Sequence, residues 1–456
     1  MTMSFSTNTR LSPSEAEMFV DSLKVFDVAS VGSPEWTRQH EYVEKLNIQA
    51  ILNASADEDE FVKSFLISYE KFPVLITDLL VSDVWKEKVF SQLLDMEFEP
   101  ESTFPLYITL YHEATVINLL ETTLYFPESC ESADESLLDL VDYCYRKLTD
   151  IISRSKEKFE EIKDFVNEPG SSNMQDLEKQ AAKLNFDISV KAMSIMRYVT
   201  DNVDGITLSI LTRILNTHDL PILLVELLEN PPWTQEIKGK TYRYYDCKWH
   251  EMKSTEDNLK LTKTEGQVWI ALFNVIMKSS CQKKYEMTSY RKNILMKLRS
   301  HLTELLLDQM PALVEMRRYL EYLGHMETPA VKNELILEQI PQIRENILKK
   351  NKGKWKKLAR KQSQTYFNPS EEFIRGQAKR WAETYNLDVL DELIPEPPKC
   401  AVCGEKATKR CSRCRNIWYC RRECQVSHWP KHKAVCDLIN EEKSDTNTKE
   451  NTKNQQ

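Results

Sequence analysis

Apolar residues recur along most of this 456-residue chain at helical rather than strand spacing. The segments Phe61–Leu66, Leu75–Leu80 and Leu137–Cys144 place apolar side chains three and four positions apart, which lines up one face of a helix. Short breaks containing Pro or Asn separate such segments. The pattern predicts an all-α body whose helices bury one face against their neighbours.

A proline followed by a run of apolar residues recurs in these segments, at Phe72–Leu80, Leu220–Leu228 and, more weakly, Met310–Met316. In the first two, a tryptophan follows the proline by twelve residues, at Trp85 and Trp233. Proline suits the first turn of a helix, where its missing N–H has no intrahelical partner to lose. The pattern resembles the start of the third helix in armadillo-type repeats, so we expect an irregular armadillo-like solenoid. Because the separations are unequal, an irregular all-α body remains the alternative.

One stretch, from Tyr242 to His250, departs from the helical pattern. Its aromatic residues are dense and partly alternate with polar ones after a double proline, which predicts a short hairpin or an ordered loop. Cys247 and His250 have the spacing of half a metal site, but no second pair lies nearby in the sequence, so we do not expect a metal there. Three further cysteines are expected to be small apolar core residues: Cys130, Cys144 and Cys281.

Glycine is scarce, at nine residues in the whole chain, and no two glycines form a Gly-x-Gly. Average proteins contain roughly 7% glycine. Phosphate-cradling loops and nucleophile elbows depend on glycine, so these catalytic devices are not expected. The composition therefore favours a helical protein without enzymatic activity.

The candidate chemistry lies near the C-terminus, where seven cysteines lie between positions 400 and 436, and one of the two histidines in this range completes the ligand pattern. Their order is Cys-x2-Cys, Cys-x2-Cys, Cys-x3-Cys and His-x3-Cys. Eight such ligands make two tetrahedral zinc sites with no position left for water, which is the arrangement of structural zinc. A segment this short cannot bury a sufficient core, so zinc must supply most of its folding free energy. His428 is the alternative to His432 as a ligand, but the three-residue spacing to Cys436 favours His432.

The spacing, together with Trp418–Gln425 and Trp429, resembles the MYND zinc-finger family. In that family the ligand pairs alternate between the ions. The resemblance implies one site made of Cys400, Cys403, Cys420 and Cys424, and a second made of Cys411, Cys414, His432 and Cys436. A disulfide framework is the alternative, but a reducing compartment would keep these thiols free.

Charge is distributed unevenly along the chain. Residues 399–436 carry +8, residues 437–456 carry −2 and residues 1–398 carry −15. A basic finger invites a nucleic-acid interpretation, but seven thiolates and two zinc ions would lower its charge to about +5, and no recognition helix of the C2H2 type is present. We expect no direct binding to nucleic acid.

MYND fingers that bind proline-containing peptides use three positions that match Ser412, Gln425 and Trp429 here. A tryptophan face can receive an apolar peptide residue, and a glutamine can supply a donor and an acceptor to the peptide backbone. The resemblance therefore implies a peptide-binding groove at these residues. The alternative is that Trp429 only packs in the finger's own small core.

Stretches outside the finger, including Glu44–Ser55, Ile117–Glu121, Leu138–Cys144, Gly266–Leu272 and Arg380–Tyr385, resemble a family of MYND-finger proteins that help to assemble axonemal dynein arms. The resemblance implies a cytoplasmic adaptor for motile cilia, near the centrosome, the centriolar satellites or the ciliary base. The implied partners are a leucine-rich-repeat dynein-assembly co-factor, chaperones and co-chaperones, and dynein chains as clients.

Two other classes of protein share the finger. A MYND-containing lysine methyltransferase would need a mostly β catalytic domain with glycine-containing motifs, which this chain does not show. A nuclear co-repressor that binds proline-containing peptides would share the finger chemistry. Against it, the basic run Lys354–Lys357 is more simply a solvated helix face.

The expected domain order is a helical body over residues 1–394, a proline-rich linker over 395–398, the finger over 399–436 and a polar, disordered tail over 437–456. No signal peptide and no run of 18 apolar residues occurs, so we expect neither secretion nor a membrane span.

Overall fold

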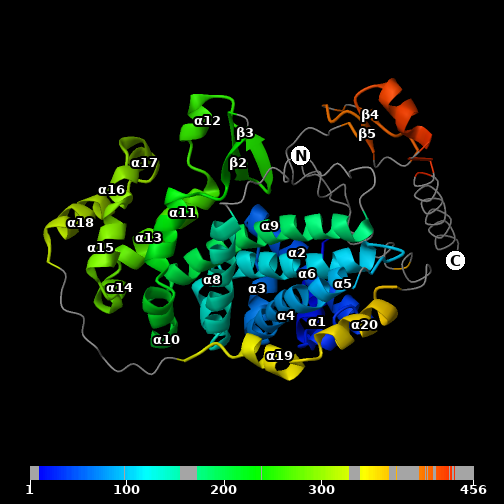
Figure 1. Cartoon of the computed structure of the whole chain (residues 1–456), viewed down its shortest axis with the longest axis horizontal. Coiled ribbons are helices and arrows are strands. Elements are labelled where there is room, and N and C mark those ends of the chain that lie inside the picture. Colours follow the sequence, from blue (N-terminus) through cyan, green and yellow to red (C-terminus); the bar gives the residue numbers. More distant parts are fainter. Residues whose placement is uncertain are drawn as a thin grey trace. The chain divides into compact units, whose positions relative to one another are not determined.

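Helices dominate the computed structural model, which confirms the all-α prediction (Figure 1). The structure describes residues 10–96, 98–154, 172–237, 239–327, 339–368, 376 and 400–436, the last range without 406, 408, 414–416, 431 and 434–435. The chain divides into two units, of which Arg10–Arg375 is the helical body and the second contains the finger. The expected linker 395–398 and tail 437–456 lie outside the described residues.

The first half of the body is built from these elements: α1 (Pro13–Ser22), η1 (Val28–Ser30), α2 (Pro34–Ala56), α3 (Phe61–Ser68), α4 (Phe72–Trp85), η2 (Lys86–Phe90), α5 (Ser91–Asp95), α6 (Phe104–Thr123), α7 (Pro127–Ser132), α8 (Ser136–Arg154) and α9 (Asn173–Asp201). Helix α6 packs against α2, α4 and α9, and it is buried except along one half-buried stripe that includes Tyr107, Tyr111 and Asn118. A helix with so wide a buried surface belongs in the middle of a core. The body is therefore organised around α6.

The second half continues with α10 (Leu208–Thr212), η3 (Arg213–Thr217), α11 (Leu220–Glu229), β1 (Thr234–Ile237), β2 (Lys240–Tyr245), β3 (Lys248–Glu251), α12 (Thr255–Leu259), α13 (Lys263–Met277), α14 (Ser279–Lys284), α15 (Ser289–Met296), α16 (Leu298–His301), α17 (Glu304–Gln309), α18 (Leu313–His325), α19 (Ile343–Asn351) and α20 (Trp355–Thr365). Helices α11 and α15 pack together, and α13 packs against α9 and α18. This packing of successive helices is compatible with an armadillo-like arrangement, which stays a prediction.

Two of the three proline signals mark helix starts. Pro73 and Pro221 lie in the first turns of α4 and α11, as predicted, and Trp85 and Trp233 are both buried. The prediction at Pro311 is wrong, because α18 begins two residues later. There the carbonyl of Pro311 accepts a hydrogen bond from the Val314 N–H at 3.1 Å, so the proline forms a turn before the helix.

The predicted hairpin is confirmed as β2 and β3, which pair antiparallel with Tyr245 opposite Lys248. Both loop residues, Asp246 and Cys247, have positive φ, at 49° and 57°, as a two-residue type I′ turn requires. Strand β1 adds to the other side of β2 and was not predicted. Tyr244 and Trp249 face Phe186 of α9, so the sheet packs on the helical core.

The body contains two apolar clusters. The larger one runs through most of the helices, and the smaller one joins η1, α4, η2, α5 and α20. Cys130, Cys144 and Cys281 are all buried in the larger cluster, as expected. Within the part of the chain that the structure describes, no single helix is long and apolar enough to span a membrane. The bent pair Leu208–Thr217 and Leu220–Glu229 reaches that length and apolar composition only when its two segments are taken together.

Candidate metal centre

The finger's local frame is a small hairpin followed by a helix. Strand β4 (Lys409–Arg410) pairs antiparallel with β5 (Trp418–Tyr419), and residues 422–430 are helical. The N–H of Cys400 donates to the carbonyl of Glu405 at 2.7 Å, which closes a tight loop around the first Cys-x2-Cys pair. Gly404 in this loop has a φ of +72°, a left-handed conformation that favours glycine.

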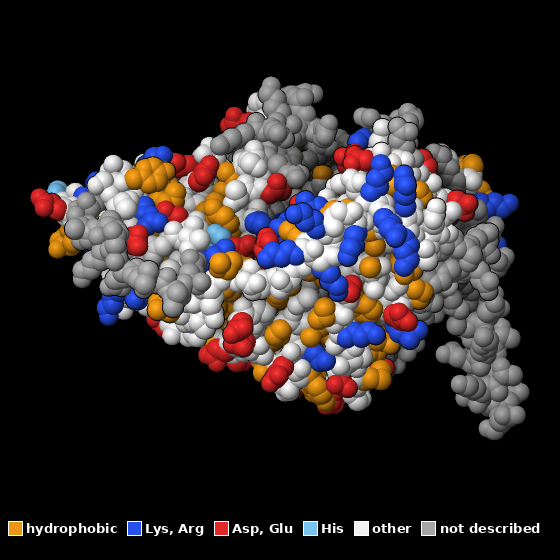
Figure 2. Space-filling model, turned by 60° about the horizontal axis from the view of Figure 1, so that its bottom comes forward, with side chains coloured by type: hydrophobic (Ala, Val, Ile, Leu, Met, Phe, Trp, Pro, Cys, Tyr) orange, Lys and Arg blue, Asp and Glu red, His pale blue; other side chains and the backbone are white. Residues whose placement is uncertain are grey.

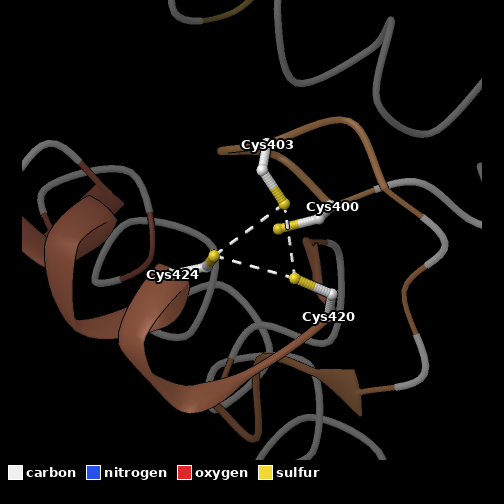
Figure 3. A group of neighbouring side chains, drawn as sticks. All are labelled: Cys400, Cys403, Cys420 and Cys424. Atoms are coloured by element: carbon white, nitrogen blue, oxygen red, sulfur yellow. Dashed lines mark hydrogen bonds between the residues drawn. The ribbon is translucent and has the colours of Figure 1, made fainter.

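Four cysteine side chains converge between this loop, the end of β5 and the helix (Figure 3). The Cys403 sulfur lies 3.3 Å from that of Cys420 and 3.9 Å from that of Cys424, and the Cys420 and Cys424 sulfurs are 3.7 Å apart. All four sulfurs, including that of Cys400, lie within 4.8 Å of one another. Zinc–sulfur bonds of about 2.3 Å in a tetrahedron place sulfurs about 3.8 Å apart. The four cysteines therefore fit one zinc ion.

A second group contains Cys411, His432 and Cys436, whose ligand atoms also lie within 4.8 Å of one another. The Cys411 and Cys436 sulfurs are 3.9 Å apart, and all three side chains are buried. The expected fourth member, Cys414, lies outside the described residues. His428 is not in this group, and its Nδ1 lies 3.0 Å from the Tyr419 hydroxyl instead. Pro430 is itself helical, so the helix presents His428 and His432 one turn apart.

Tyr419 is a structural residue of the finger whose role was not predicted from the sequence. It is only 1% exposed and packs among four buried cysteines, Cys400, Cys411, Cys424 and Cys436. Its hydroxyl faces His428, whose ring stacks parallel to that of His432 at 5.8 Å. Tyr419 thus supports the histidine ligand through His428. The sequence feature that could have indicated this role is the aromatic pair Trp418–Tyr419, which lies immediately before the ligand Cys420.

Backbone N–H groups make the first site receptive to a cation. Burial opposes ionisation of Cys400, but hydrogen bonds from the backbone of Cys403, Cys420 and Val402 outweigh it and lower its pKa to about 6. Hydrogen bonding to the neighbouring Cys403 sulfur raises the pKa of Cys420 to about 12. A bound zinc ion would stabilise the thiolate form of its cysteine ligands.

The three expected peptide-binding residues do not form one hydrogen-bonded cluster within the described part of the finger. Gln425 and Trp429 are half-buried and lie one helical turn apart on the same face, whereas Ser412 is exposed in the turn after Cys411. Trp429 packs against the finger's core and meets the His432 ring edge-on at 5.9 Å. The packing role proposed as the alternative for Trp429 is therefore present, and its side chain is only half-buried.

A histidine–aspartate chain in the body was not anticipated from the sequence. His40 and His112 approach at 2.8 Å through their Nδ1 atoms, and the Nε2 of His112 lies 3.0 Å from Asp78. All three residues are 0% exposed, so no substrate can reach them. Burial lowers the pKa of His40 well below its usual value, which keeps that ring neutral. These three hydrogen-bonded side chains link α2, α4 and α6 and are part of the core.

A second buried cluster is centred on Lys147 of α8, whose ammonium lies 2.8 Å from both Asp83 and Glu113. Lys86 also pairs with Glu113, and the Arg146 guanidinium donates to Asp83 at 2.8 Å. Burial opposes ionisation of Asp83, but Lys147 and Arg146 outweigh it and hold its pKa well below the usual range. Because each charge here has an opposite neighbour, the cluster is an ion-pair network that joins α4, α6 and α8.

Residues 400–436 match the model of the MYND finger family. The cysteine and histidine groups and this match together define a zinc-finger protein of the MYND class.

The similarity extends far beyond the finger. The chain is 33% identical over 446 residues to the zinc finger MYND domain-containing protein 10 homolog of Drosophila melanogaster, covering 93% of this chain and 98% of that protein. The chain belongs to the zinc finger MYND domain-containing protein 10 family.

Other similarities are short. Ubiquitin carboxyl-terminal hydrolase 19 of Arabidopsis thaliana is 43% identical over 47 residues, which is 10% of this chain and 7% of that protein. Ubiquitin C-terminal hydrolase 15 of rice, Oryza sativa subsp. japonica, is 45% identical over 47 residues, which is 5% of its length. Matches of this extent carry no argument about activity. No solved structure matches the chain.

Proposed function

We propose that the finger holds two structural zinc ions, one on Cys400, Cys403, Cys420 and Cys424 and one on Cys411, Cys414, His432 and Cys436. The sulfur separations of the first site and the burial of the described members of the second support this assignment. Metal analysis of the full chain should find two zinc ions. Cys247→Ser, which changes an exposed cysteine of the body, should keep both ions, whereas Cys424→Ser should not. A single zinc ion or an iron centre in the unmodified chain would contradict the assignment.

We propose that the protein acts as a non-enzymatic cytoplasmic adaptor in the chaperone-assisted preassembly of axonemal dynein arms. The observation that carries the proposal is the similarity over 93% of the chain to one family, with the finger included. The proposed partners are the leucine-rich-repeat co-factor, chaperones with their co-chaperones, and dynein chains as clients.

The charges of the two units support an adaptor. Residues 1–398 carry −15 and the finger residues 399–436 carry +8 before metal binding, so these two parts of the chain offer docking surfaces of unlike charge. Complementary charge steers partners and suppresses wrong ones. The buried polar clusters described above are closed to solvent or internally paired, so they support a structural rather than a catalytic body.

Depletion in ciliated cells tests this function. Cilia should form but should be immotile and lack dynein arms in electron micrographs of axonemes. The level of axonemal dynein heavy chain in the cytoplasm should fall. Re-expression of the intact chain should restore the arms. Intact arms and normal motility after depletion would overturn the proposal and favour the nuclear co-repressor alternative.

We further propose that Gln425 and Trp429 bind a proline-containing peptide on their shared helix face. Gln425→Ala should weaken binding to an immobilised set of proline-containing peptides while two zinc ions stay bound, and Trp429→Ala should weaken it by about 2 kcal/mol or more. Val426→Ala is the matched control, because Val426 is 63% exposed on the same helix. Unchanged binding by both variants would place the peptide contact elsewhere.

A further inference from the structure

Helices α19 and α20 and the turn between them carry an unusual concentration of positive charge. Residues 343–365 contain nine Lys or Arg and one acid, a balance of +8, whereas the rest of residues 1–398 carries −23. Eight of the nine basic side chains are exposed: Lys349, Lys350, Lys352, Lys354, Lys356, Lys357, Arg360 and Lys361. Figure 2 shows Lys and Arg side chains gathered on this face of the body. We call these eight residues the basic face.

The basic face is held rigidly by the opposite side of α20. Gln362 is 0% exposed and its carbonyl oxygen accepts a hydrogen bond from the Trp85 indole N–H at 2.8 Å, while its amide donates to the carbonyl of Val28 at 2.8 Å. Ala359 and Phe367 are buried in the smaller apolar cluster, and Trp355 and Leu358 pack against it. The orientation of α20 is thus set by its buried side, which leaves its charged side facing solvent.

Few of these charges are neutralised within the body. Among the described residues, an ion pair of the basic face joins Lys350 to Asp27 at 2.8 Å, and both side chains are mostly exposed. Within α20, Lys356 and Arg360 are four residues apart, as are Lys357 and Lys361. Like charges at this spacing repel each other and destabilise the helix slightly. An acidic occupant would relieve that repulsion.

We propose that the basic face is a docking surface for an Asp- and Glu-rich segment of a partner protein. A short acidic segment matches the charge and extent of two helices joined by a tight turn. The inference goes beyond the proposed adaptor function and stands independently of the finger and its zinc.

Other polyanions fit this surface less well. A membrane-binding amphipathic helix inserts apolar side chains between lipids, but none of the large exposed apolar residues of the described chain lies between 343 and 365. A nucleic acid extends well past such a patch and would meet the rest of residues 1–398, which carries −23. Single-stranded nucleic acid also needs exposed aromatic platforms, whereas Trp355 packs against the apolar cluster.

Charge reversal tests the surface with the full, zinc-loaded chain. The probe is a fluorescein-labelled ten-residue peptide of alternating Asp and Glu, and its Asn and Gln counterpart reports non-electrostatic binding. The double variant Lys356→Glu with Arg360→Glu should weaken binding of the acidic peptide about tenfold or more in fluorescence anisotropy. Lys283→Glu with Lys284→Glu is the matched control, because it changes the charge equally at two exposed lysines of α14, and it should shift the affinity less than twofold.

The control separates the basic face from the basic finger, which is unchanged in both variants. Circular dichroism should show the same helix content for both. Equal weakening by the two variants would overturn the proposal, since only net charge would then matter. Tighter binding of a twenty-nucleotide oligoadenylate, or of vesicles rich in phosphatidylserine, with the same sensitivity to the α20 variant would overturn it in favour of that ligand.

Discussion

The helical body and the finger are held together by different forces. In the body, large carbon side chains such as Trp36, Trp85 and Trp233 are fully buried. In the finger, four of the six residues in the described buried cluster are cysteines, and Tyr419 is the large one. Apolar burial stabilises the body without any ligand, whereas the finger's interior is made of metal ligands. The difference teaches that two parts of one chain can be destabilised separately, the finger by removal of its metal and the body by disruption of its apolar core.

Zinc removal should separate the two regions most strongly. A chelator, or Cys424→Ser, should unfold the finger, because each structural zinc contributes roughly 10–16 kcal/mol at neutral pH. The body should keep its helix content and its melting temperature, since the described ligands lie outside residues 10–375. Hydrogen exchange resolved by residue checks both statements at once. Loss of protection in α6 after chelation would show that the regions are not independent.

Removal of one buried charge should damage the body without touching the finger. Lys147→Met leaves the Asp83 and Glu113 carboxylates without their shared ammonium, which should cost about 3–5 kcal/mol in urea unfolding of the body. Arg10→Met is the control, because the Arg10–Glu58 pair is exposed and should contribute less than about 1 kcal/mol. An equal, small effect of both variants would mean that the buried network is not strongly coupled.

A change in the stability of the body with pH should also arise from one of its buried groups, Glu44. Burial raises the pKa of Glu44 from 4.5 to about 7, against a hydrogen bond from Thr115 and the nearby His112 that lower it. The folded state therefore binds more protons than the unfolded state between pH 4.5 and 7, so this group reduces stability as pH rises through that window. Glu44→Gln should remove this loss, which is of the order of 3 kcal/mol at pH 8.

The pH test compares variants rather than raw profiles, because buried His40 acts with the opposite sign. Its lowered pKa means that the unfolded state binds more protons as pH falls below 6.5, so stability is lost toward acid. The difference between Glu44→Gln and the unmodified chain isolates the carboxyl. Glu35→Gln, an exposed position on the same helix, should leave the profile unchanged. A flat difference across pH 4.5–8 would contradict the assignment.

The smallest expected effect concerns the attachment of α20. Gln362→Leu leaves the Trp85 indole N–H without its acceptor and removes one donor from the Val28 carbonyl, which should cost about 1–3 kcal/mol. Gln364→Leu, exposed on the same helix, should change stability little. The free energy of unfolding in urea measures both. An equal cost at the two positions would show that the buried amide does not anchor the helix.

Local signals predicted much of this molecule. Apolar periodicity placed α3, α4 and α8, and proline placed the starts of α4 and α11, because these signals act within a few residues. The prediction that proline marks a helix start was wrong at Pro311, which lies in the turn that precedes α18. In the finger, the metal's need for a fixed number of ligands makes spacing informative, and the structure gathers the cysteines of the first site in the expected set.

Long-range relations could not be predicted in this way. Trp85 and Gln362 are 277 positions apart, and nothing near either residue specifies the other. The Lys147 network likewise joins charged residues from three helices, and nothing near each residue in the sequence specifies its partners. The Lys354–Lys357 run was interpreted as a solvated face, and the orientation of that face depends on Trp85 and Val28, which hold the opposite side of α20 from far away in the sequence.

The hydrogen bond between Trp85 and Gln362 has a consequence for the synthesis of the chain on the ribosome. A ribosome adding about 5–20 residues per second needs roughly 14–55 s to travel from the first residue to the second. During that interval the smaller apolar cluster lacks Ala359 and Phe367, and the indole N–H has no permanent partner. A nascent chain in this state exposes apolar surface and requires protection. A premature stop before residue 355 would therefore remove not only the finger but also the last piece of a core begun by the first hundred residues.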